Sequence, residues 1–381
     1  MLNRKNWLLI SLVLIGIGTA GALNILINGE EVMGINNDVP WGILIAGYVF
    51  FAVASTGVGL ISSLGHVFGM QWFEAISKRA LLASLILLLC GFGVLLFDLG
   101  NPLRMLNFLL SPNLSAPIWW MGALYGLYLI LLLLELNYSL KNDHHKVKPI
   151  AKVAFFVKLA AVSNLGAVFA MLYARPYWSG AFYPVYMIVT AILSGAALLS
   201  IIYYFIDNKK AEGTQSLVKI LGKILTAFLA VTLLMELWQV LIALYGSTPG
   251  KYSALMALIN GPLSIRFWLM QIVIGLVIPL ILLLGNNYNS RKVFNAAVLT
   301  MVGILSMRLN FVTVGQIIPL WSGENLIYNS YIPSWSEWTV IIGAIGASIF
   351  LYLIGEQKFD LTISESGNDS KVMASKAQLN S

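Results

Sequence analysis

Charged residues are scarce in this chain of 381 residues. Asp, Glu, Lys and Arg make up 10% of it, whereas a soluble domain carries about 25%. Hydrophobic residues make up 59%, which predicts an integral membrane protein with several spanning helices. The formal net charge of +7 does not indicate a nucleic-acid partner, because the basic residues fall in short segments between apolar runs.

Cysteine and histidine are also rare. The single cysteine, Cys90, lies in an apolar run, which excludes an internal disulfide and a Cys-rich metal or iron–sulfur site. His66 is the one histidine in a predicted span, so a haem held by two histidines is excluded, while a Met/His pair stays open. If this chain handles electrons, we expect a diffusible organic carrier and metal cofactors on a partner.

Ten segments are long and apolar enough to span a bilayer, which takes about 20 residues. The run after Arg4 and Lys5 lacks a small-residue cleavage site, so we expect a retained first helix. The tail over 357–381 is polar and Ser-rich and is predicted to be disordered. The ten segments are 7–28, 41–65, 80–99, 119–138, 150–173, 182–206, 217–245, 266–285, 293–315 and 338–355.

Basic residues divide unequally between the two sides of the membrane. Most fall on the side of the N-terminus, whereas Arg104, Arg175, Lys251 and Arg266 fall on the other. The positive-inside rule then predicts that both termini are cytoplasmic.

Polar side chains from separate spans are predicted to meet near the outer face. Asp98 ends the third span, Glu236 lies in the outer part of the seventh, and Arg308 and Asn310 lie in the outer half of the ninth. An ionisable group beside hydrocarbon costs roughly 2.5–3.5 kcal/mol on insertion scales, so it needs a partner or a function. One interpretation is a set of ion pairs, Asp98 with Arg104 and Glu236 with Arg308.

The other interpretation is a polar pocket for a lipid-soluble ligand with two oxygens, and a quinone fits this description. Arg, Asn, Gln, Tyr and Trp side chains can hydrogen-bond its oxygens, and an acid can exchange its protons. Arg308 and Glu236 are the most costly to bury, so they are the best candidates for the centre of the pocket.

Three more ionisable residues are predicted near the inner side. Glu135 and Lys158 lie on consecutive spans, and His66 lies at the inner end of the second. Lys158 can pair with Glu135 or extend to the interface. A proton path through Glu135, Lys158 or His66 is the alternative to this anchoring role.

Several short motifs, in this order, resemble the NrfD/PsrC family of membrane subunits, and nearly the whole chain takes part. The early motifs are Val39–Ala46, Leu60–Gly69 and Asp98-Leu99-Gly100-Asn101-Pro102. The later ones are Arg308-Leu309-Asn310, Gly315-Gln316 and Tyr331–Glu337, which are similar to the ten-helix branch that includes the HybB-type hydrogenase subunit.

The resemblance implies an all-α membrane domain over 1–356, with two four-helix bundles, about 41–173 and 182–315, and one extra helix at each end. It implies a pocket for a menaquinone- or ubiquinone-type quinone at the outer face, and no haem or iron–sulfur cluster in this chain. It also implies two outer partners, a ferredoxin-like iron–sulfur subunit and a catalytic subunit of the hydrogenase or molybdopterin type.

Site residues follow from the motifs and from depth. Glu236 and Asp98 are the candidates for proton exchange, and Arg104 and Arg175 are the candidates for the partner interface. The candidates for quinone binding are Arg308, Asn310, Trp41, Tyr173, Tyr177 and Gln316.

The sequence therefore predicts a quinone-reactive membrane anchor of an iron–sulfur oxidoreductase complex in a bacterial or archaeal cytoplasmic membrane. Two alternatives stay open. A secondary transporter would need a pair of Gly/Pro-broken helices in matching positions, and no such pair is seen. A purely structural anchor would bind no quinone and would tolerate changes at the outer pocket.

Overall fold

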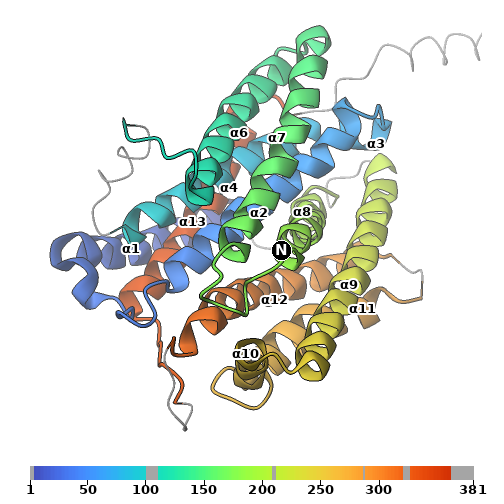
Figure 1. Ribbon diagram of the computed structural model, residues 1–381. Helices are drawn as coiled ribbons and strands as arrows, with labels where there is room; N and C mark the ends of the chain where they lie inside the picture. The colour runs from blue at the N-terminus through green and yellow to red at the C-terminus, as the bar shows by residue number, and fades with distance from the viewer. Residues whose placement is uncertain (1–3, 100–109, 208–211, 286–287, 321–326, 362–381) are drawn as a thin grey trace, which may run out of the picture.

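The computed structural model describes residues 4–99, 110–207, 212–285, 288–320 and 327–361. Regular structure in these ranges is helical, and they contain no β-strand (Figure 1). The elements are α1 (Arg4–Asn28), η1 (Gly29–Val32), α2 (Ile43–His66), α3 (Gln71–Glu74), α4 (Ser77–Asp98), α6 (Pro117–Leu140), α7 (His144–Ala170), α8 (Phe182–Asp207), α9 (Glu212–Gly246), α10 (Pro249–Ile259), η2 (Arg266–Val277), α11 (Ile278–Leu283), α12 (Ser290–Ile317) and α13 (Trp335–Lys358).

Ten helices within the described ranges are long and apolar enough to cross a membrane. They coincide with the ten predicted segments, so the all-helical, ten-span prediction is confirmed. The largest difference is at α7, which begins at His144 rather than at residue 150. The side chain of Asp143 accepts a hydrogen bond from the Lys146 amide and caps the helix there, before the apolar run begins.

α2 is the central helix. Of its most apolar stretch, 94% is buried inside the protein, against 22% for α1. It packs against α4, α7, α8 and α12. The contact with α8 is made through backbone, because a Cβ on Gly57 would lie 1.7 Å from the Ala191 carbonyl oxygen, and Gly195 meets Gly57 from the other side. Small residues permit this close approach of helices in a membrane.

α1 and α13, from the two ends of the chain, lie side by side (Figure 1). Gly18 and Gly343 are in backbone contact, and Asn24 Nδ2 donates a hydrogen bond to Ser336 Oγ at 2.8 Å. α13 also packs against α4. The two extra helices predicted at the ends therefore form a pair on the flank of the protein.

The Tyr331–Glu337 motif fixes the start of α2 to the start of α13. Ser334 caps α13, and the carboxylate of Glu337 accepts hydrogen bonds from the Gly34 amide at 2.8 Å and from the Tyr331 phenol at 2.9 Å. The Tyr331 oxygen in turn accepts from the Ile43 amide at 2.6 Å. Burial and the negative charge of Glu337 raise the pKa of Tyr331, so its phenol stays a donor.

The division into two four-helix bundles stays a prediction. α2 with α4 and α6 with α7 form close pairs, and α8 packs against α9 and α12. However, α2 also packs extensively against α8, so the predicted bundles share a continuous interface. The cytoplasmic position of both termini likewise stays a prediction, and most of the tail after residue 357 lies outside the described residues.

Candidate functional site

Glu236 of α9 lies in a buried hydrogen-bond network that joins α8, α9, η2 and α12. Its Oε1 accepts from the phenol of Tyr186 on α8 and from Gln271 Nε2 on η2, the latter at 2.8 Å. Gln271 Oε1 accepts from Asn310 Nδ2 at 2.7 Å, and Asn310 Oδ1 accepts from Arg266 Nε at 2.5 Å. A continuous chain of hydrogen bonds thus connects a carboxylate to a guanidinium.

The helical form of η2 positions two members of this network. η2 is a π-helix, in which hydrogen bonds run between residues five apart, so residues at that spacing share a face. In an α-helix the shared face falls at spacings of three and four instead. Arg266 and Gln271 are five apart, and both reach Asn310.

Arg308 of α12 is fully buried beside this network. Its Nη2 donates to Thr190 Oγ1 at 2.6 Å and its Nη1 to Met187 Sδ at 3.2 Å, while its Nε has no hydrogen-bond partner among the described residues. Glu236 and Arg308, both within those residues, do not form an ion pair with each other. A buried cation with neutral partners is costly, and Arg308 does not line the pocket that lies over Glu236.

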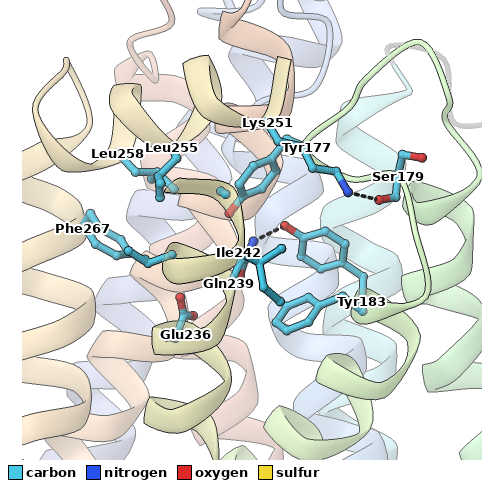
Figure 2. A pocket seen from close by; sticks show the side chains of 13 residues that line it. Tyr177, Ser179, Tyr183, Glu236, Gln239, Ile242, Lys251, Leu255, Leu258 and Phe267 are labelled. Carbon is cyan, nitrogen blue, oxygen red and sulfur yellow. Dashed lines mark hydrogen bonds between the residues drawn. The ribbon is translucent and has the colours of Figure 1, made fainter. Parts of the chain in front are cut away.

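A pocket of about 100 Å³ lies over Glu236. Figure 2 shows Glu236 and Gln239 on α9 and Tyr183 on α8 around its polar side, with Gln239 Nε2 donating to the Tyr183 oxygen at 2.6 Å. Its other walls are apolar and come from α9, α10 and η2. They include Val240, Ile242, Ala243, Leu255, Leu258 and Phe267.

A hydrogen bond bridges the pocket on the side of α10. Lys251 of α10 reaches across to the segment before α8, where its Nζ donates to the Ser179 carbonyl at 3.0 Å (Figure 2). This bond ties α10 to the 177–180 segment over the pocket. The pocket thus has a few polar groups at its base and a mostly apolar lining, as small-molecule sites do.

Of the two tyrosines predicted for the pocket, Tyr177 lines it and Tyr173 does not. The ring centroids of Tyr177 and Tyr183 are 5.8 Å apart. Burial raises the pKa of Tyr177, and the charge of Glu236 raises it further, so the phenol is protonated at neutral pH. Tyr173 is 81% exposed.

Trp41 and Gln316 have a structural role in this geometry. The Gln316 amide accepts from the Trp41 backbone N–H and donates to the Trp41 carbonyl, each at 3.0 Å. Its Nε2 also donates to the Val312 carbonyl at 2.8 Å. The Trp41 ring packs on Phe169 and Trp178. Neither predicted residue lines the pocket; together they fasten the segment before α2 to the end of α12.

Arg175 is also engaged with backbone. Its Nη1 donates to the carbonyls of Gln316 at 3.2 Å and Ile318 at 2.9 Å. It lines a second hollow, of about 230 Å³, beside Tyr177. Burial lowers the pKa of Arg175, and Asp38 raises it. Its predicted contact with a partner subunit stays a prediction.

Asp98 belongs to a different cluster from Glu236. The acidic groups that act on it electrostatically are Glu337, in the first turn of α13, and Glu30, in η1. Its Oδ1 is buried without a hydrogen-bond partner among the described residues. Arg104, its predicted partner, lies outside the described residues. The shared depth of Asp98 and Glu236 therefore does not place them in one pocket.

The three inner residues are brought together. Glu135 Oε2 accepts from Lys158 Nζ at 3.2 Å, and Glu135 Oε1 lies 3.1 Å from His66 Nδ1. Glu135 and Lys158 are fully buried. Lys158 Nζ also donates to the Gly59 carbonyl at 3.1 Å and to Ser63 Oγ at 3.0 Å, which satisfies all three of its protons. Of the two predicted states of Lys158, the structure adopts the pair with Glu135.

The sequence analysis missed several polar residues of the site. Gln271 carried a usable signal, because it is the one amide in an otherwise apolar span. Tyr183 and Tyr186 carried no such signal, because tyrosines near the end of a span are expected in the interfacial aromatic belt. The π-helix has no signal in the sequence. Within the described ranges, no group of three His, Cys, Asp or Glu side chains could hold a metal ion.

Known proteins provide an independent comparison. The sequence model of the family "Polysulphide reductase, NrfD" matches residues 31–319. The chain is 27% identical to a selenate reductase subunit of Mesobacillus selenatarsenatis, over 94% of each protein. It is 26% identical to the Hdr-like menaquinol oxidoreductase integral membrane subunit of Archaeoglobus fulgidus, over 86% of each protein. It is also 26% identical to a polysulfide reductase subunit of Wolinella succinogenes, over 74% of this chain and 95% of that one.

The match covers most of the chain, including α2 to α12, and the ten apolar helices agree with it. The chain is a multi-pass integral membrane protein that belongs to the polysulphide reductase NrfD family.

Proposed function

We propose that this chain is the quinone-reactive membrane subunit of a multi-subunit oxidoreductase. It exchanges electrons between an iron–sulfur partner on the outer side and the quinone pool of a bacterial or archaeal cytoplasmic membrane. The observation that carries the proposal is Glu236, a buried carboxylate at the base of a mostly apolar pocket. The names of two relatives support the ligand: a menaquinol oxidoreductase integral membrane subunit and a menaquinone reductase integral membrane subunit, 26% and 22% identical to this chain.

The residues of the pocket suit a quinone. Gln239 and the phenols of Tyr177 and Tyr183 supply neutral hydrogen-bonding groups for its oxygens. Glu236 is the group that takes up and releases its protons. Arg308 is fully buried and Arg266 half-buried, both with neutral partners, so they provide positive potential that favours electron arrival at the ring. When bound, the quinone supplies two-electron, two-proton chemistry.

The other predicted residues take supporting positions in this proposal. Asn310 is hydrogen-bonded to both Arg266 and Gln271, and Gln271 in turn donates a hydrogen bond to Glu236. Asn310 thereby helps to hold Glu236 in place. Trp41 and Gln316 hold α2 against α12 and keep the outer ends of these helices aligned. Asp98 and Arg175 are proposed to lie toward the surface that would meet the iron–sulfur subunit, beyond which a hydrogenase or molybdopterin catalytic subunit would lie. Arg104 is proposed for the same surface from its sequence position, because it lies outside the described residues.

The inner cluster is the proposed source of protons. His66, Glu135 and Lys158 are linked to one another by hydrogen bonds. Lys158 Nζ is 5.8 Å from the centre of the Tyr128 ring, and the rings of Tyr128 and Tyr125 are 6.4 Å apart. Tyr125 lies within electrostatic range of Arg308. A series of buried polar groups therefore extends from the inner end of α2 toward the outer pocket.

The experiment is purification of the tagged chain in mild detergent, followed by assay of bound quinone and of subunits. We expect an iron–sulfur subunit and a quinone to copurify, with turnover that depends on added quinone or quinol. A matched Arg308→Ala preparation should retain the iron–sulfur subunit and lose the quinone. A complex that assembles and turns over without quinone would instead support the purely structural anchor.

A further inference from the structure

The pocket over Glu236 has one exposed wall. Its lining residues all lie in the described part of the chain, and among them Ile242 is the exposed one, at 61%. The deeper lining is closed: Tyr183, Phe267, Leu255 and Leu258 are each at most 3% exposed. The lining of the pocket therefore reaches the surface of the protein at Ile242.

That surface faces lipid. On α9, Leu234, Trp238 and Ile242 recur every four residues, so they share one face of the helix, and each is more than half exposed. Exposed apolar side chains on a spanning helix contact hydrocarbon. Val185, close to the start of α8, is 56% exposed as well. Phe182, in the first turn of α8, lines the pocket and is partly exposed.

The side of the pocket that faces α10 is bridged by a hydrogen bond instead. Lys251 holds α10 to the Ser179 carbonyl across it (Figure 2), and Leu255 and Leu258 of α10 also line the pocket. A ligand that enters from water would have to break this contact. A ligand that enters from lipid would pass Ile242, which is exposed, and Phe182, which is partly exposed.

We infer that the seam between the outer ends of α8 and α9, flanked by Phe182 and Ile242, is a lateral portal for a polyprenyl quinone. This inference rests on the proposed function and adds the entry route and the position of the tail. The cavity of about 100 Å³ is smaller than the cavity of about 150 Å³ that holds benzene, so lining side chains must move for the ring to enter, and a long tail cannot fit beside it. The ring occupies the pocket, and the tail leaves between Phe182 and Ile242 to lie along Trp238 in the lipid.

The test distinguishes the contribution of the tail to binding from the contribution of the ring. Menaquinone-4 carries an isoprenoid tail, and menadione has the same ring system without one. With the purified complex in lipid nanodiscs, Ile242→Trp should weaken menaquinone-4 binding at least tenfold and change menadione binding less than threefold. Leu237→Trp is the matched control, because Leu237 is a 52% exposed residue of α9 that does not line the pocket, and it should change neither affinity.

A second measurement does not depend on a bulky side chain. The single native cysteine, Cys90, is buried, so Ile242→Cys introduces one accessible thiol. Menaquinone-4 should slow its alkylation by a lipid-soluble maleimide severalfold, and menadione should not. Unchanged menaquinone-4 binding in Ile242→Trp, or equal weakening of both compounds, would overturn the portal while the proposed function stands. If the wild-type complex binds neither compound, the proposed function itself fails.

Discussion

Replacing Glu236 by glutamine removes the proton-exchanging group of the pocket and keeps the size of the side chain. The amide oxygen can still accept from Tyr186 and from Gln271 Nε2, which donate to Glu236 Oε1 in the native protein. The hydrogen-bond network toward Asn310 and Arg266 therefore survives. What is lost is the carboxylate that takes up or releases a proton.

The structure sets the expected magnitudes. Proton transfer by a positioned group contributes about 10²- to 10⁴-fold, so quinone-linked turnover of Glu236→Gln should fall by at least about 10²-fold. Stability should change little. Two hydrogen bonds to a charged acceptor, about 1.5–3 kcal/mol each, become neutral ones of about 0.5–1.5 kcal/mol. The cost of burying the carboxylate, several kcal/mol, disappears at the same time and opposes that loss.

The assay is turnover of the purified complex with menaquinone-4 or its quinol, alongside thermal unfolding and subunit content. Glu31→Gln, at an exposed acid outside the pocket, is the control and should retain full activity. Turnover of Glu236→Gln within threefold of wild type, in an intact complex, would refute the reasoning. So would a complex that falls apart, because that result assigns Glu236 a purely structural role.

Two further predictions concern the other buried charges. Arg308→Ala removes a fully buried guanidinium whose hydrogen-bond partners are Thr190 and Met187. The complex should still assemble, while quinone-linked turnover should fall more than tenfold because the positive potential is lost. Activity gels and subunit stoichiometry check this prediction, and normal turnover would contradict it. Lys158→Met leaves Glu135 buried without its cation and should destabilise the protein by about 3–5 kcal/mol, whereas the double variant with Glu135→Gln should regain most of that stability in thermal unfolding. The same double variant, in vesicles with an internal pH dye, should lose proton uptake from the inner side, and unimpaired uptake would exclude the inner path.

The ten spans could be predicted because hydrophobic length is a property of the sequence alone. The pairing of Glu135 with Lys158 was also within reach, since two buried opposite charges on consecutive helices have few other partners. Depth was a weaker guide. Asp98 and Glu236 were predicted at similar depths, but they lie in different clusters: Asp98 near Glu337 and Glu30, and Glu236 beside Tyr186 and Gln271.

Other features depend on tertiary geometry that no local pattern encodes. Gln316 resembles a ligand-binding amide, yet the backbone of residue 41 satisfies it, and only the packing of α2 against α12 reveals this. Arg308 and Glu236 were candidates for an ion pair, but Arg308 donates to Thr190 and Glu236 accepts from Tyr186, both on α8. The π-helix that aligns Arg266 with Gln271 likewise follows from packing rather than from the residues themselves.

The central claim is that the quinone ring lies over Glu236, between α8, α9 and η2. Photocrosslinking with a ring-azido menaquinone, followed by mass spectrometry of the digested complex, tests it most directly. The account predicts crosslinks within residues 177–183 and 236–243, which excess menaquinone-4 abolishes. Crosslinks confined to other helices, such as α1 or α13, or crosslinks that menaquinone-4 does not displace, would contradict it.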